Sequence, residues 1–101
     1  MKMQAVFNGV VIAESDDTVV VEGNHYFPAA SVTDEFLIDT PTHTTCAWKG
    51  VASYYSVQAA GKTAPDAAWY YADPFDAAKQ VHDRIAFWKG VEVRPAPGPI
   101  S

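Results

Sequence analysis

The sequence predicts a mainly β domain with two antiparallel sheets in a tent-like arrangement and one short helix late in the chain. Glycine and proline divide the 101 residues into short pieces, which is typical of β-rich domains. Several pieces alternate in side-chain character, as VASYYSVQA does, so that neighbouring residues should face opposite sides of a sheet. The intervals between the pieces are too short for the crossovers that parallel strands need, and antiparallel pairing is therefore expected.

Dipeptides that contain glycine mark the predicted turns. Asn8-Gly9 separates MQAVFN from VVIAES and is a strong hairpin signal, because both residues tolerate positive φ. Gly23-Asn24 separates TVVVE from HYFPA, and Gly61-Lys62 is a further predicted turn. Pro28 has no N–H group, so its strand should end there or lie at an edge of the sheet.

The middle of the chain predicts further strands. SVTDEFLI can begin with a helical turn and continue as a strand at residues 36–39. In VASYYSVQA, Tyr55 shares a face with Val57, whereas Tyr54 faces the other side. DAAWYYA is a predicted strand in which Ala67, Trp69 and Tyr71 share a face, and RIAFWKGVEV is another predicted strand.

The clearest helix signal follows residue 72. Asp73 is a good N-cap residue and Pro74 suits the first helical position. The spacing of Phe75, Ala78 and Val81 gives an apolar stripe, and the helix should end near His82. We expect one domain over residues 1–94, followed by a disordered, proline-rich tail at residues 95–101.

Charge and composition exclude several classes of function. The formal net charge is −5, and the seven basic residues are scattered, which argues against nucleic acid and anionic membranes as partners. The chain has no long apolar run and no apolar segment at its N-terminus, so a soluble cytoplasmic protein is expected. A single cysteine without a CxxC pair excludes an internal disulfide and the usual structural zinc site. No cofactor is expected.

The block TTCAWKGVASYY concentrates aromatic and ionisable residues around one predicted turn. The leading hypothesis is a pocket for a small molecule or peptide, since aromatic walls with a few polar groups are typical of ligand sites. Plain core packing is the alternative interpretation. The expected ligand-binding residues are Trp48, Lys49, Tyr54, Tyr55, Trp69 and His25.

Lys49 and Gly50 each have a specific interpretation. Lys49 can anchor an anionic ligand at the mouth of the pocket, or it is a surface lysine paired with Asp66 or Asp73. Gly50 suggests a backbone conformation or a close approach that a side chain would block.

Cys46 supports a second hypothesis, an enzyme that uses this thiol as a nucleophile or redox group. Such a thiol needs a depressed pKa, and Lys49 and His43 each lie three residues away. The alternative is a buried cysteine that acts as a small apolar residue. His43 and Cys46 form only a weak pair of metal ligands, so no metal site is expected. The third hypothesis is a protein-interaction module with an exposed aromatic face. The oligomeric state stays open.

The order of four motifs resembles a known family. These motifs are AVFNGVVIAESDDTVVVEGNHYFP, TCAWKGVASYYSV, AAWYY and AFWKGVEV, and they are similar to a bacterial domain-of-unknown-function family, number 427. Ala47 stands where that family usually has proline, so the resemblance does not imply a proline-stiffened turn here.

The resemblance implies the tent-shaped, Mss4-like antiparallel β fold. Relatives with that fold hold zinc through two CxxC pairs, which this chain lacks. A nucleotidyltransferase label is attached to the family, but the chain shows neither a glycine-rich phosphate loop nor the paired carboxylates of that chemistry.

Overall fold

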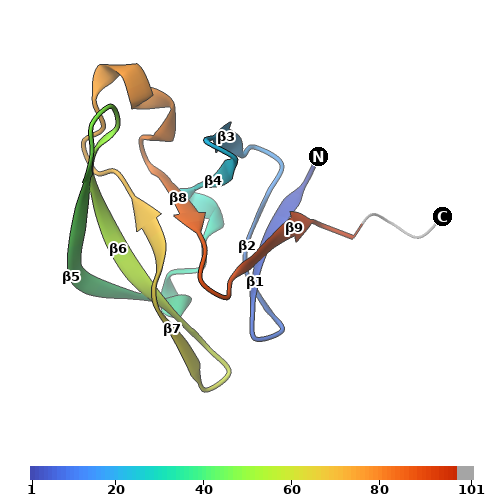
Figure 1. Cartoon of the computed structure of the whole chain (residues 1–101). Coiled ribbons are helices and arrows are strands. Elements are labelled where there is room, and N and C mark those ends of the chain that lie inside the picture. Colours follow the sequence, from blue (N-terminus) through green and yellow to red (C-terminus); the bar gives the residue numbers. More distant parts are fainter. Residues whose placement is uncertain (98–101) are drawn as a thin grey trace.

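Two antiparallel sheets make up the structure (Figure 1), as the sequence predicts. The computed structural model describes residues 1–97. The small sheet has the order β2-β1-β9 and the large sheet the order β3-β4-β8-β7-β6-β5. In Figure 1 the small sheet lies at the right, the long strands β5, β6 and β7 lie at the left, and β8 lies between them. The mainly β class is thus confirmed, and the relation to the Mss4-like fold stays a prediction.

The strands of the described chain have the following bounds: β1 Met3–Phe7, β2 Val10–Ser15, β3 Val19–Val21, β4 Asn24–Pro28, β5 Leu37–Cys46, β6 Gly50–Ala59, β7 Lys62–Tyr70, β8 Arg84–Phe87 and β9 Glu92–Pro95. Short 3₁₀ segments connect some of them: η1 Ala29–Ser31, η2 Asp34–Phe36 and η3 Asp76–Val81.

The hairpin predicted at Asn8-Gly9 is confirmed. Both residues have positive φ, 52° and 79°, and β1 pairs with β2 on either side of them. The Asn8 amide also donates to the carbonyl oxygens of Ala59 and Ala60, at 3.1 and 3.2 Å. Asn8 therefore ties the turn of the small sheet to the turn between β6 and β7 of the large sheet.

The predicted turns at Gly23-Asn24 and Gly61-Lys62 are wrong by one residue. The turn residues are Glu22-Gly23, with φ values of 54° and 80°, and Ala60-Gly61, with 52° and 82°. A tight turn with positive φ at both residues matches the twist of the flanking strands, and glycine takes its second position in both cases. Glu22 consequently lies at the tip of the β3–β4 hairpin.

The short helical element predicted late in the chain is present and ends at His82 as expected, but it does not begin at Pro74. The segment is the short 3₁₀ element η3, which starts at Asp76 and is interrupted at Ala78, where φ is −124°. Phe75 is extended, and its N–H donates to the carbonyl of Lys49 at 3.0 Å. Ala78 is buried as predicted, whereas Phe75 is 53% exposed and lies outside the stripe.

The segment RIAFWKGVEV is not one strand. It turns at Lys89-Gly90, where φ is 49° and 95°, so β8 belongs to the large sheet and β9 pairs with β1 of the small sheet. Pro95 is the last residue of β9, and the next residue, Ala96, donates its N–H to the carbonyl of Lys2 at 2.8 Å. Of the predicted tail, residues 98–101 lie outside the described residues.

Apolar side chains gather on both faces of the large sheet. The first cluster lies between the two sheets and includes Ile12, Phe27 and Val57. The second cluster lies on the opposite face, where η3 covers part of it: Val21, Tyr26, Ala52, Trp69, Tyr71, Ala78, Val81 and Ala86. Tyr55 packs on the first cluster and Tyr54 on the second, as the alternation along β6 predicts. No helix of the described chain has the length and apolar character needed to cross a membrane.

Candidate functional site

A cavity of about 230 Å³ lies beside the second cluster. Its walls come from the β3–β4 turn, β4, the β5–β6 turn, β6, β7 and the residue after β8. The lining residues are Glu22, Asn24, Tyr26, Lys49, Tyr54, Trp69, Tyr71 and Trp88. Five of these eight are aromatic and two are charged. Because pockets for drug-sized ligands span about 300–1,000 Å³, this cavity suits a smaller molecule.

Lys49 is the buried charge of this cavity, with only 5% of its surface exposed. Its ammonium donates to Glu22 Oε1 in a salt bridge and lies 4.9 Å from the ring centroid of Trp48 and 5.7 Å from that of Tyr71. Burial has the largest single effect and would lower the pKa of Lys49, but the hydrogen bond to Glu22 together with charge interactions with Tyr71, Tyr26 and Cys46 outweighs it, so the pKa is raised. Lys49 is therefore a permanent cation at neutral pH and not a free amine.

Glu22 is the partner of Lys49, and not Asp66 or Asp73, the partners considered in the alternative interpretation of this lysine. The hairpin turn carries its carboxylate to the edge of the cavity, where 53% of the side chain is exposed. The hydrogen bond from Lys49 lowers the pKa of Glu22, so the carboxylate is ionised at neutral pH. The indole Nε1 of Trp48 is 3.5 Å from Glu22 Oε2, which leaves Trp48 at the rim.

The aromatic wall is a connected set of rings. Trp69 meets Tyr26 edge to face, with centroids 6.1 Å apart, and its Nε1–H donates to the Tyr26 hydroxyl at 3.1 Å. Trp69 also meets Trp88 edge to face at 5.5 Å. Burial raises the pKa of Tyr26, and it raises that of Tyr71 to about 12. Both phenols therefore remain neutral and can act as hydrogen-bond donors to a ligand.

The structure brings together only part of the predicted set. Lys49, Tyr54 and Trp69 line the cavity, and Trp48 contacts Lys49 from the rim. Tyr55 does not line the cavity, because it faces the opposite side of the sheet. His25 does not line the cavity either: its Nδ1 is hydrogen-bonded to the Thr18 hydroxyl at 2.8 Å.

Five lining residues were not among the expected ligand-binding residues: Glu22, Asn24, Tyr26, Tyr71 and Trp88. A signal for Tyr71 existed, since the period of two places it on the same face as Trp69. The same period pairs Trp88 with Ala86, which belongs to the second cluster. No such signal existed for Glu22, because its position depends on which two residues form the β3–β4 turn.

Cys46 ends β5 beside the cavity but does not line it. It is half-buried and packs against the second cluster. The backbone N–H of Trp48 lowers the pKa of the thiol most, burial opposes this, and Lys49 adds to the lowering. His43 is exposed, and its ring hydrogen-bonds the Pro41 carbonyl at 2.9 Å. Within residues 1–97, no group of three histidine, cysteine or acidic side chains is arranged to hold a metal ion.

The comparison with known proteins identifies the family. A search among curated proteins found no similar sequence. The family model described as domain of unknown function (DUF427) matches residues 1–94, which include every residue of the cavity. The chain therefore belongs to the DUF427 family.

Proposed function

We propose that the cavity around Lys49 binds a small aromatic carboxylate. The observation that carries the proposal is a buried ammonium group, Lys49, at the wall of a cavity lined mainly by aromatic rings. A cation in such a setting is weakly screened by water and attracts an anion strongly. The surrounding rings offer edge-to-face and stacking contacts to a planar ligand.

Glu22 supports the choice of a carboxylate. Its own carboxylate occupies one side of the Lys49 ammonium, so this position accepts the geometry of such a group. Because Glu22 lies on an exposed turn, its side chain can move aside and leave Lys49 to the ligand. Glu22 is then a competitor that a matching ligand displaces.

Replacing Lys49 with methionine should weaken binding of benzoate at least tenfold. Methionine keeps most of the apolar stem but removes the charge, and a hydrogen bond to a charged group contributes about 1.5–3 kcal/mol. Tryptophan fluorescence follows the titration, because Trp69 and Trp88 line the cavity. Lys62→Met is the matched control: it removes the same charge from the exposed first residue of β7 and should leave the affinity unchanged.

Glu22→Gln should have the opposite effect in the same experiment, because it removes the competing carboxylate while keeping the shape of the side chain. Benzoate should bind more tightly to this variant, and the neutral analogue benzamide should bind all the proteins weakly. Equal binding of benzoate and benzamide, or equal losses in the Lys49 and Lys62 variants, would contradict the proposal.

Chemistry at Cys46 is a second candidate function, favoured by the lowered pKa of the thiol. Iodoacetamide should alkylate Cys46 in the folded protein, with a rate that rises at a lower pH than for a free thiol. Lys49→Met should move this rise to higher pH, because Lys49 contributes to the lowering. Reaction only after unfolding in urea would rule this function out.

A further inference from the structure

A second cavity, of about 260 Å³, lies among β7, β8, η1 and the segment before β8. It differs from the Lys49 cavity in its position and chemistry. Tyr70 and Tyr55, which line it, pack on the first cluster, whereas Trp69 and Tyr54 pack on the second. The two cavities thus take alternate residues from β6 and β7, although Tyr71, the residue after β7, borders both, and the proposed function leaves this cavity unassigned.

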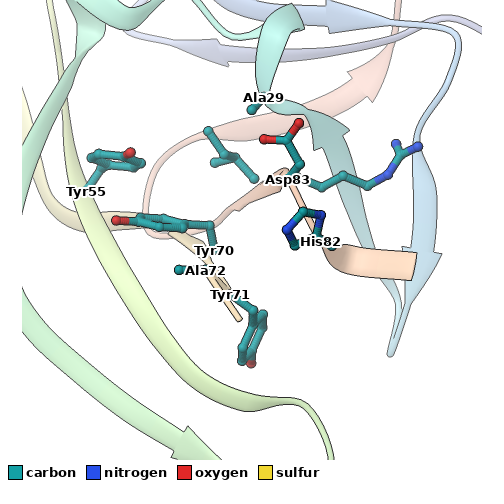
Figure 2. Close-up of a pocket in the computed structure, with 9 residues that line it drawn as sticks. Ala29, Tyr55, Tyr70, Tyr71, Ala72, His82 and Asp83 are labelled. Atoms are coloured by element: carbon teal, nitrogen blue, oxygen red, sulfur yellow. The ribbon is translucent and has the colours of Figure 1, made fainter. Parts of the chain in front are cut away.

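One wall of this cavity is a stacked pair of tyrosines. The rings of Tyr55 and Tyr70 have centroids 4.9 Å apart and planes inclined by 22°. In Figure 2 this pair lies on one side, His82 and Asp83 lie on the other, and the Tyr71 ring is turned away from the pair. Such a pair presents electron-rich π surface, which attracts cations.

The opposite wall carries an uncompensated carboxylate. Asp83 is exposed and, within the described part of the chain, its carboxylate makes no salt bridge. Its backbone carbonyl accepts a hydrogen bond from the Ala29 N–H at 2.9 Å. Asp83 also has a φ of 59°, so the backbone holds this residue in the left-handed region at the cavity edge.

The neighbouring cation does not neutralise Asp83. Arg84 lines the cavity as well, but its guanidinium donates to the backbone carbonyl and to the carboxylate of Asp17, the latter at 3.4 Å. It also donates to the carbonyl of Tyr26 at 3.4 Å. The charge of Arg84 is thus balanced by Asp17. Asp34 and Asp39 add further negative charge, since the electrostatic field of their carboxylates reaches the phenol of Tyr55.

We propose that this cavity binds a small organic ammonium cation. The cationic head lies between the Tyr55–Tyr70 pair and the Asp83 carboxylate, so that cation–π attraction and charge pairing act on it from opposite sides. The volume fits a compact molecule, since it lies below the range of pockets for drug-sized ligands. The two cavities would then take ligands of opposite charge on the two faces of one sheet.

The test is an NMR titration of the ¹⁵N-labelled full chain with choline chloride at constant ionic strength. Amide shifts should change around Tyr55, Tyr70 and Asp83. The uncharged isostere 3,3-dimethylbutan-1-ol should bind at least tenfold more weakly. Equal binding of the isostere, or choline shifts confined to the Lys49 cavity, would overturn the proposal. Choline-induced shifts scattered over acidic surface residues would also overturn it.

Matched variants separate the site from general charge effects. Asp83→Asn should weaken choline binding about tenfold, and asparagine tolerates the positive φ of this position, so the variant should fold. Glu92→Gln removes the same charge from β9, where Glu92 pairs with Arg94, and should leave the affinity within about twofold. Equal effects of the two variants would overturn the proposal. Lys49→Met should leave choline binding unchanged. The proposal for this cavity and the proposal for the Lys49 cavity can therefore fail independently of each other.

Discussion

Replacing Trp69 with alanine should lower the free energy of unfolding by about 3–5 kcal/mol, the usual cost of truncating a buried tryptophan. Trp69 is 9% exposed, and its ring meets those of Tyr26 and Trp88. The substitution also leaves the Tyr26 hydroxyl without the Trp69 hydrogen bond. Because natural domains are stable by only about 5–15 kcal/mol, this loss is a large share of the total stability. Urea unfolding followed by circular dichroism measures the loss.

Trp48→Ala is the matched control for this experiment. Trp48 is 37% exposed and lies at the rim of the cavity, so the same deletion should cost at most about 1 kcal/mol. Similar losses in the two variants would mean that the second cluster does not depend on Trp69. The loss of stability in Trp69→Phe should lie between those of Trp48→Ala and Trp69→Ala, since phenylalanine keeps a ring in the cluster but cannot form the hydrogen bond to Tyr26.

The faces of most strand residues were predictable from the side-chain period of two, but Ala67 packs on the first cluster while Trp69 and Tyr71 pack on the second, since irregularities in strand pairing interrupt that period. The same period is why Tyr54 and Tyr55 separate onto the two clusters as expected. Which two residues form each turn was harder to predict. Gly23 and Gly61 were both recognised as turn residues, but glycine takes the second turn position, and that choice depends on the twist of the paired strands.

The late helical segment shows the limit of local start signals. Asp73 and Pro74 are good residues for a helix start, yet Phe75 is extended, its N–H donates to the Lys49 carbonyl, and the helical segment begins at Asp76. A helix of two turns is marginal on its own, so good start residues are not enough to fix where it begins. Nothing local in the sequence announces a contact 26 residues away.

The candidate site was predictable only in part for the same reason. Lys49 and Trp69 were identified because they lie in blocks rich in aromatic residues. Glu22 is 27 residues from Lys49, and the sheet order puts the β3–β4 and β5–β6 hairpins at opposite edges of the large sheet, so the two residues meet only because that sheet curves. Sheet order depends on long-range pairing, which residue patterns do not encode one strand at a time.

Replacing Gly50 with alanine should lower the free energy of unfolding by about 1–3 kcal/mol and also weaken benzoate binding in the Lys49 cavity. Gly50 has a φ of +112°, a conformation that residues with a Cβ avoid. The added Cβ would lie 3.4 Å from the Asp73 carbonyl oxygen and 3.7 Å from the Phe75 nitrogen. These are ordinary contacts, so backbone strain carries most of the cost.

Relief of this strain requires movement of the turn that carries Lys49, because Gly50 follows it directly and the Lys49 carbonyl is fixed by the Phe75 N–H. Gly61→Ala is the matched control. Gly61 lies just beyond the other end of β6 with a φ of +82° and nothing within 4 Å of an added Cβ. That variant should lose stability through strain alone and keep its affinity for benzoate. If Gly61→Ala weakened binding as much as Gly50→Ala, the loss would reflect general destabilisation. If Gly50→Ala changed neither stability nor affinity, Gly50 would not be what positions Lys49.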